Sequence, residues 1–546
     1  MKPAASRIPR HRREDVLAWC VALAAVGTIL WANGTLLSPA ALLHLSDEGY
    51  IQAVAIRMVD GQMLPYVDGA GHRGPLLYWV AAIATAWFGH EDWTAIRVLG
   101  LGTMSLTALG AFLAGRAGRH PFAGALGAVA VAFVGIIALY PADGMSYNGE
   151  YLLDVFAMGG LLATAVGLGR HSERPRLGYV ALAGACAALG ALSKQSGAVL
   201  LPALGTWVLA AAASREGLVR RERFALLGAF AGGFGAPLAL VALRYGAAGQ
   251  LDGLLYYGWT YNVDVYMQTV SGEIKRLTVI RWLTDRAVLF GAGLALVLWG
   301  LRRPFSGGLR GWLRRWDEDG FTATVALGAL LGLIACNTTL RSFWHYYVQI
   351  VPWFGCLAGL LIDRALARRS RGPRRATIQR VLVAAPMLLI VIASWAASVD
   401  TYRQAQERIR EETSSWCAAI DEWVSPTEPL FVWGFRPDLY VWCNRRPASR
   451  FVYTTFVAGF VPWANWMTKE QEDQFATPGS RQELIAELEA TQTPLIVDAG
   501  ASLAGRGLLR YEELARYVRK RYCPAGTLPN MPLWARRTGA ECPGPE

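Results

Sequence analysis

The sequence is poor in charged residues. Only 17% of its 546 residues are Asp, Glu, Lys or Arg, and 53% are hydrophobic, whereas soluble domains carry about 25% charged residues. This composition excludes a disordered chain and disfavours an ordinary soluble enzyme. No two cysteines are separated by two residues, so the eight cysteines point neither to a zinc site nor to a thioredoxin-like motif.

The hydrophobic residues gather in blocks that are long enough to cross a membrane. About 20 residues at about 1.5 Å per residue cross a hydrocarbon core of about 30 Å. Blocks of spanning or near-spanning length predict eleven membrane helices at residues 16–37, 94–115, 121–140, 151–169, 178–193, 196–213, 224–243, 286–301, 321–337, 345–363 and 381–398. The first block lacks a clear cleavage site, so we expect it to remain as the first span of an α-helical multispan membrane protein.

The basic residues predict the orientation of these spans. Residues 75–89 form a further apolar block that reaches only about 22 Å as a helix, so we expect it to lie at the outer surface. With the basic segment 1–15 in the cytoplasm, the inner links carry 26 basic residues and the outer loops before residue 399 carry nine. This asymmetry predicts a plasma-membrane protein with residues 16–398 as its transmembrane domain and 38–93 as its first outer loop.

The remaining residues, 399–546, are predicted to form a small extracytoplasmic α/β domain. The segments PLFVWG and PLIVDA are typical of short buried strands, and RQELIAELEA between them is typical of an amphipathic helix. Four cysteines fall in this region, at positions 417, 443, 523 and 542. In an oxidising compartment they could form up to two disulfides with three pairings, or stay free and buried.

Acidic residues fall in two segments on the predicted outer face. Asp47 and Glu48 follow the first span, and either carboxylate could accept a proton from an attacking hydroxyl. Asp47 would alternatively cap a helix. The second segment holds Asn148, Glu150 and, just inside the next span, Asp154, and an acid within a span is usually paired or functional.

Basic and aromatic residues follow on the same predicted face. They are His72, Arg73, Lys194, Arg341, His345 and Tyr346. Lysine and arginine bind phosphate well, although each could instead anchor the chain at the membrane interface, and Tyr346 also suits an aromatic belt. Acids and cations at one face suit the transfer of a sugar from a lipid-linked phosphate, because a carboxylate takes the acceptor proton while cations stabilise the leaving phosphate.

At these positions the chain resembles the GT-C superfamily of polyprenyl-phosphate-sugar glycosyltransferases, in particular the bacterial relatives of protein O-mannosyltransferase and lipid A aminoarabinose transferase. The resemblance covers roughly residues 16–400. The segments that carry it are DEGY at 47–50, RGPLLY at 73–78, NGE at 148–150, KQ at 194–195 and HYY at 345–347 with Gln349 and Pro352. Some members also share VWGFRPDLY and RRPASRF in the tail.

The resemblance implies roles for single residues. Asp47 matches the essential acid of the first loop and Glu150 that of the second loop, while Lys194, Arg73 and His345 match positions that meet the donor phosphate. The family often has Lys-Pro where this chain has Arg73-Gly74, which keeps the positive charge but changes the local geometry. The expected partners are a polyprenyl-phosphate sugar, an envelope lipid, glycan or protein acceptor, and membrane lipids.

Other functions stay open at this point. A transporter or flippase of a lipid-linked saccharide would place its key charges at mid-membrane and is often built from repeats, which the sequence does not display. A scaffold with a partner-binding tail would not need the acids. An oligosaccharide ligase would use a diphosphate-linked donor and could use a divalent metal, so no cofactor is assigned and no metal ligands are named. The net charge of +12 resides mostly in the short links, which argues against nucleic acid as a partner.

Overall fold

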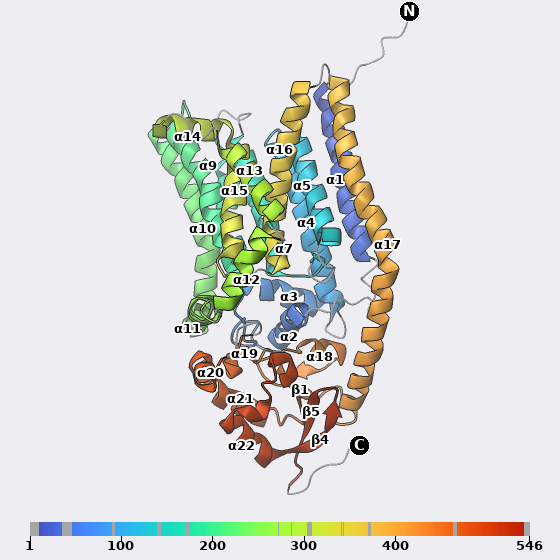
Figure 1. Cartoon of the computed structure of the whole chain (residues 1–546). Helices are drawn as coiled ribbons and strands as arrows, with labels where there is room; N and C mark the ends of the chain where they lie inside the picture. The colour runs from blue at the N-terminus through green and yellow to red at the C-terminus, as the bar shows by residue number, and fades with distance from the viewer. Residues whose placement is uncertain are drawn as a thin grey trace, which may run out of the picture.

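The apolar blocks of the sequence form a bundle of helices, and the last part of the chain forms a smaller domain at one end of it (Figure 1). The structure is a computed structural model. It describes residues 10–34, 46–89, 93–138, 144–169, 174–270, 272–284, 287–302, 308–339, 341, 343–369, 373–461 and 467–539.

The first half of the bundle contains α1 (Arg10–Gly34), α4 (Thr94–Ala117), α5 (Pro121–Phe133) with the π-helical turn η1 (Val134–Ala138), α7 (Gly149–Leu168), α8 (Leu177–Ser193), the 3₁₀ turn η2 (Gln195–Val199), α9 (Leu200–Ser214) and α10 (Arg220–Ala247). The second half contains α11 (Leu251–Leu255), the π-helical turns η3 (Tyr256–Thr260) and η4 (Asn262–Tyr266), α12 (Gly272–Leu283), α13 (Ala287–Leu301), α14 (Gly308–Glu318), α15 (Gly320–Asn337), the 3₁₀ turn η5 (Trp344–Ile350), α16 (Val351–Arg369) and α17 (Pro373–Asp421).

Eight helices of the described chain are long and apolar enough to cross a membrane. Each corresponds to one of the eleven predicted blocks. The other three blocks form shorter apolar helices at Pro121–Ile137, Leu177–Ser193 and Gly291–Leu301. The prediction of a helical multispan fold is confirmed, while the number of eleven crossings stays a prediction.

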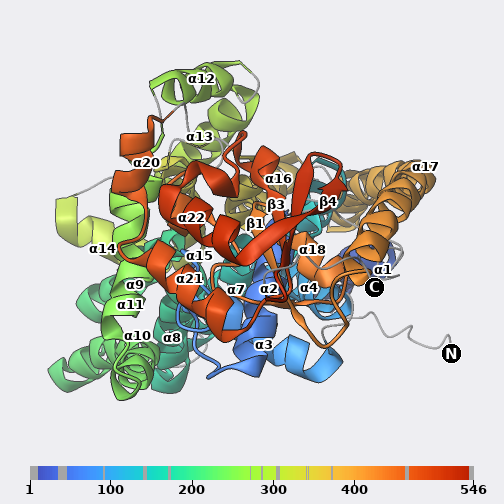
Figure 2. The same cartoon turned by 90° about the horizontal axis from the view of Figure 1, so that it is seen from below.

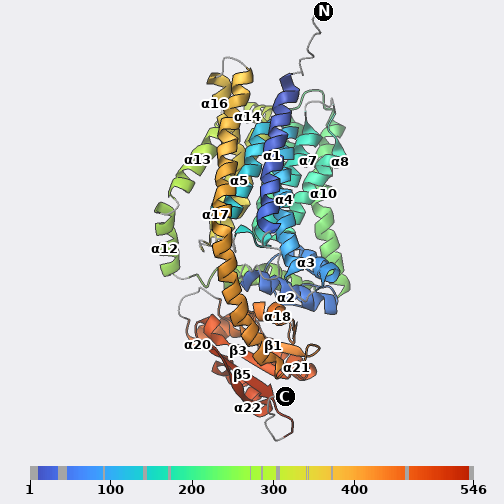
Figure 3. The ribbon, with the colours of Figure 1, turned by 90° about the vertical axis from the view of Figure 1, so that its right-hand side faces the viewer.

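Two short helices of the first loop, α2 (Ser46–Asp60) and α3 (Pro75–Phe88), lie where the bundle meets the smaller domain (Figures 1 and 3). Pro75 occupies the first turn of α3, where its missing N–H costs no helical hydrogen bond. The described start of the chain lies at the opposite end of the bundle (Figure 1). Seen from below, the smaller domain covers α2 and the middle of the bundle (Figure 2).

The smaller domain is built on a five-stranded sheet of order β2-β1-β3-β5-β4. Its strands are β1 (Pro429–Gly434), β2 (Arg446–Pro447), β3 (Leu495–Ala499), β4 (Tyr522–Leu528) and β5 (Met531–Arg536). The short helices are α18 (Asp438–Trp442), α19 (Thr455–Ala458), α20 (Lys469–Phe475), α21 (Ser480–Ala490) and α22 (Glu512–Arg521), with the 3₁₀ turns η6 (Gly500–Leu503) and η7 (Leu508–Arg510). The two predicted strands are β1 and β3, which pair in parallel, and the predicted helix is α21.

The junction between bundle and domain is one uninterrupted helix. Helix α17 has 49 residues, so the expected boundary at residue 399 falls inside it. Cys417 on α17 forms a disulfide with Cys443 after α18. Cys523 is disulfide-bonded as well, whereas Cys542 lies outside the described residues.

Candidate active site

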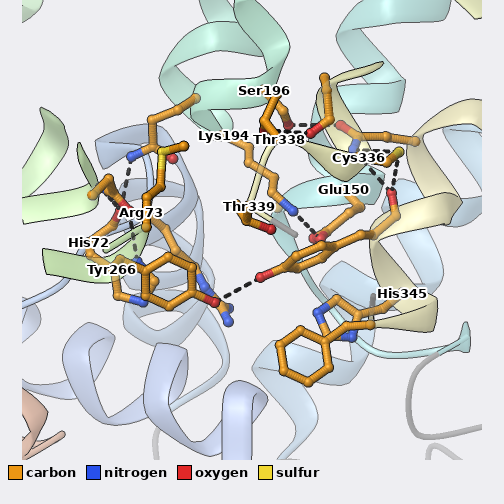
Figure 4. A pocket seen from close by; sticks show the side chains of 18 of the residues that line it. His72, Arg73, Glu150, Lys194, Ser196, Tyr266, Cys336, Thr338, Thr339 and His345 are labelled. Carbon is orange, nitrogen blue, oxygen red and sulfur yellow. Dashed lines mark hydrogen bonds and ion pairs between the residues drawn. The ribbon is translucent and has the colours of Figure 1, made fainter. Parts of the chain in front are cut away.

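A cavity of about 860 Å³ lies where the bundle, the first loop and the C-terminal domain meet. Seven of the predicted site residues line it: Asp47, His72, Arg73, Glu150, Lys194, His345 and Tyr346. They come from segments that are far apart in the sequence (Figure 4). The fold therefore brings most of the predicted site together.

Asp47 and Arg73 form an ion pair in the cavity wall. Asp47 lies in the first turn of α2, where the helix dipole favours a negative charge. Arg73 Nη2 lies 2.8 Å from Asp47 Oδ2. Burial alone would raise the pKa of Asp47, but Arg73 and then His345 hold that pKa below its usual value. Asp47 is therefore ionised at neutral pH.

Gly74 explains how Arg73 reaches this position. A Cβ atom at Gly74 would lie 2.0 Å from the carbonyl oxygen of Leu192, so any larger residue would push this loop away from the end of α8. Lys194 follows directly after α8. The Arg73-Gly74 sequence, which departs from the Lys-Pro of the resembled family, thus places Arg73 against the segment that carries Lys194.

Glu150 and Lys194 form the second ion pair of the cavity. Asn148 caps α7, because its Oδ1 accepts a hydrogen bond from Tyr151 N–H at 3.0 Å, and Glu150 follows in the first turn. Lys194 has an extended backbone between α8 and η2. Its Nζ also lies 4.2 Å from the centre of the Tyr346 ring, a distance typical of a cation–π contact.

His72 is held by residues that the sequence did not single out. Its carbonyl oxygen accepts hydrogen bonds from Asn262 Nδ2 at 2.8 Å and from Gln195 Nε2 at 2.9 Å, and its ring stacks on Tyr266. Burial and then the neighbouring Arg73 lower the pKa of His72 to about 4. His72 is therefore neutral at pH 7.

Tyr266 and Tyr346 join two sides of the cavity. Their hydroxyl groups lie 2.9 Å apart, and Figure 4 shows Tyr266 beside His72 and Arg73. Tyr346 follows His345 in η5, and the ring of His345 stacks on that of Phe343. Tyr266 belongs to η4, in a stretch that carried no motif, and only its aromatic composition could have suggested a role.

Four predicted site residues lie outside the lining of the cavity. Glu48 is fully buried, with Oε1 accepting from Tyr147 N–H at 2.7 Å and Oε2 lying 2.8 Å from Arg97 Nη1. Asn148 acts as the cap of α7. Arg341 is buried behind the cavity and supports Tyr266.

Arg341 Nη2 donates to the Tyr266 carbonyl at 3.1 Å and to Thr269 Oγ1 at 2.9 Å. Its guanidinium lies 4.3 Å from the centre of the Tyr266 ring. Asp154 is fully buried, and within the described chain neither of its oxygens has a hydrogen-bond partner.

The C-terminal domain also contributes to the cavity. Phe435 directly after β1, Tyr453 and Val461 line it. Tyr453 packs against Phe435 and against Tyr50 of α2, with ring centres 4.7 Å and 5.4 Å apart. These residues carried no signal in the sequence, because no pattern indicates which loops of the domain face the bundle.

Part of the cavity lining is apolar. It includes Trp259, Val263, Met267 and Ile334, and Trp259 and Ile334 are also 62% and 55% exposed. Among the residues that the structure describes, no three His, Cys, Asp or Glu side chains are grouped to hold a metal ion.

Comparison with known proteins identifies the fold. Residues 72–236 match the family model described as dolichyl-phosphate-mannose-protein mannosyltransferase, and no curated protein matches the sequence. The structure of ArnT from Cupriavidus metallidurans bound to undecaprenyl phosphate is similar to this chain. The match covers 95% of this chain and 98% of ArnT, with 14% identity and a TM-score of 0.54. The match to ArnT in its apo state covers 91% of this chain and 94% of ArnT, with 15% identity and a TM-score of 0.50.

The match to an Archaeoglobus fulgidus oligosaccharyltransferase tethered with an acceptor peptide covers 95% of this chain and 74% of that protein, with 13% identity and a TM-score of 0.48. At the identity found with ArnT, structural similarity establishes the fold, and the family match adds sequence evidence over the segment that holds His72, Arg73, Glu150 and Lys194. Residues 72–236 are thus similar in sequence to this mannosyltransferase family, and the whole chain shares the fold of ArnT.

Proposed function

We propose that the protein transfers a sugar from a polyprenyl-phosphate-linked donor to a hydroxyl group of a cell-envelope lipid, glycan or protein. One observation carries this proposal. The carboxylate Asp47 and the basic residues Arg73 and Lys194 line one cavity together with His345. A base beside phosphate-binding cations is what this reaction requires.

In the proposed reaction Asp47 accepts the proton of the acceptor hydroxyl. The acceptor oxygen forms a bond to the anomeric carbon while the bond from that carbon to the phosphate oxygen breaks, and the electron pair leaves with the polyprenyl phosphate. Attack opposite the leaving group inverts the anomeric configuration. The phosphate is a weak base and needs no strong acid, so Arg73, Lys194 and His345 need only stabilise its charge.

The apolar side of the cavity supports a lipid-linked donor. Trp259, Val263, Met267 and Ile334 belong to the lining, and because Trp259 and Ile334 are also exposed, we infer an apolar path along these residues to the outside of the bundle. ArnT, which has the same fold, is described as bound to undecaprenyl phosphate. We place the polyprenyl chain along this path, with its phosphate at Arg73 and Lys194.

We further propose that the cavity and the C-terminal domain face the outside of the bacterial plasma membrane. The excess of basic residues in the links at the other end of the bundle supports this orientation. A reporter that is active only outside the cytoplasm should work when it is fused after Glu546. Activity of a cytoplasmic reporter at the same position would reverse the orientation and place the cavity inside the cell.

The direct test is to incubate the purified protein with a panel of undecaprenyl-phosphate sugars and a crude envelope extract as acceptor. We expect one donor to be consumed, with release of undecaprenyl phosphate and transfer of the sugar. The Asp47→Asn variant serves as the matched control for contaminating enzymes. Consumption that is equal in both proteins, or movement of the intact donor across vesicles without cleavage, would contradict the proposal.

A further inference from the structure

The charged side chains of the cavity already neutralise one another. Arg73 pairs with Asp47 at 2.8 Å, and Lys194 pairs with Glu150. Of the two histidines in the lining, His72 shares a 3.2 Å hydrogen bond between Nδ1 and Asn262 Oδ1. The charges of the two acids and of Arg73 and Lys194 therefore cancel in pairs within the cavity wall.

A sugar donor would disturb this balance. A phosphodiester carries one negative charge, and next to Asp47 it would place two anions around the single guanidinium of Arg73. The Asp47 and Arg73 side chains are only 31% and 19% exposed, so water screens this repulsion incompletely. Either the phosphate stays away from Arg73, or it draws Arg73 from the carboxylate.

The backbone around Arg73 restricts how the arginine can respond. Tyr66 Oη donates to the Arg73 carbonyl at 2.5 Å, and Gly74 lies against the backbone of Leu192. Because these contacts restrain the main chain at both positions, we expect the side chain of Arg73 to move between partners. Its planar fork of N–H groups suits a carboxylate and a phosphate equally.

We propose that Arg73 passes from Asp47 to the phosphate when the donor binds, so that Asp47 becomes an effective base only in the donor-loaded protein. This inference rests on the proposed function. It predicts an ordered reaction in which the donor binds first. An acceptor that arrives first meets a carboxylate whose charge Arg73 already neutralises.

The proposal also explains an otherwise unfavourable feature of the site. While Arg73 is paired with Asp47, Arg73 and His345 keep the pKa of Asp47 below its usual value, which weakens Asp47 as a base. Loss of Arg73 to the phosphate restores proton affinity at the stage when the acceptor hydroxyl must give up its proton. The same anion that occupies the leaving-group site thereby activates the base.

A double-mutant cycle tests the transfer of Arg73. The probe is the monomethyl ester of undecaprenyl phosphate, a singly charged phosphodiester that does not titrate near neutral pH. Its affinity is measured for the full-length wild-type protein, Arg73→Gln, Asp47→Asn and the double variant in detergent. Size-exclusion elution and thermal melting check that each variant is folded, and Arg73→Lys retains the charge if Arg73→Gln does not fold.

We expect Asp47→Asn to bind the probe more tightly than the wild type, because Arg73 is then free for the phosphate. Arg73→Gln should weaken binding in the Asp47→Asn background by at least about fivefold more than in the wild-type background, a coupling of the size seen between contacting residues. Strictly additive effects would overturn the transfer of Arg73, because simple repulsion between Asp47 and the phosphate does not depend on Arg73. If the wild type does not bind the probe, or Arg73→Gln has no effect in either background, the phosphate site of the proposed function fails as well.

Discussion

Asp47 and Glu48 are consecutive carboxylates on α2, but they lie in opposite surroundings. Asp47 lies 31% exposed in the cavity wall beside Arg73, whereas Glu48 is inaccessible and pairs with Arg97, which is itself 5% exposed. Adjacent helical residues point about 100° apart, so one acid faces the cavity and the other faces the packed interior. The difference teaches that an acid's role here depends on which side of the helix it occupies.

The surroundings also shift the two pKa values in opposite directions. Burial raises the pKa of Glu48 to about 7, and Arg97 opposes this only in part, whereas Arg73 and His345 outweigh burial at Asp47. At pH 7 Asp47 is ionised, whereas burial makes Glu48 hold its proton more tightly. Such a divergence separates a reactive acid from a structural one.

Removing the basicity of Asp47 should have the largest effect. Asp47→Asn keeps the size of the side chain but cannot accept the acceptor proton, so we expect turnover to fall by roughly 10² to 10⁴. The melting temperature should stay close to that of the wild type. Near-normal turnover with the preferred undecaprenyl-phosphate sugar would return Asp47 to a capping role.

Truncating Glu48 should instead damage stability. Glu48→Ala removes the acceptor of Tyr147 N–H and the partner of Arg97, and it leaves a void in a packed region. We therefore expect the free energy of unfolding to fall by about 2–4 kcal/mol. Glu48→Gln keeps the volume and an acceptor oxygen and is the matched control. Thermal unfolding in detergent measures both, and a large loss of turnover in folded Glu48→Gln would contradict the contrast with Asp47.

The second cavity pair sharpens the same comparison. Lys194→Ala should weaken the use of the donor by about 10-fold to 100-fold through lost phosphate stabilisation, with little change in acceptor KM. Lys194→Arg should rescue only part of this loss, because a planar fork does not reproduce a compact ammonium group. Donor titrations of both variants test this, and equal donor use by Lys194→Ala and the wild type would leave Lys194 as an interface anchor.

The smallest expected effect is a pH dependence that Glu48 imposes on stability. Its folded pKa of about 7 lies above the ordinary value of 4.5, so the folded protein holds this proton more tightly than the unfolded chain does. The resulting stabilisation is complete below about pH 4.5 and is lost as the pH rises through about 7. Compared with Glu48→Gln, the wild type should therefore lose stability between about pH 5 and 8, and parallel melting curves of the two proteins would contradict this.

Much of the fold could be predicted from the sequence, because hydropathy reports directly on membrane helices and on buried strands. The loops that carry Asp47, Arg73, Glu150 and Lys194 could be assigned to one end of the bundle by charge and span parity. Asp47 and Glu48 could not be told apart, because the rotation of α2 depends on its tertiary packing.

Three other features of the site needed coordinates. Arg341 looked like a phosphate ligand but lies behind Tyr266, and no sequence pattern distinguishes a ligand from a support. Tyr266 lies in a π-helical turn, whose spacing does not follow ordinary helical periodicity. Tyr453 reaches the cavity through contact between domains, which depends on tertiary structure alone.

The length of α17 has a consequence for how the cavity is closed from below. Its 49 residues rise about 74 Å at about 1.5 Å per residue, more than twice the thickness of a hydrocarbon core of about 30 Å. Its apolar first part contains the predicted span 381–398, and the helix then continues without a break to Cys417, whose disulfide with Cys443 links the sheet domain to the same helix. The number of residues in α17 therefore helps to set the height and the rotation of Phe435 and Tyr453 relative to the bundle, because one inserted residue would rotate the C-terminal end of this helix by about 100° against the contact between Tyr453 and Tyr50 of α2.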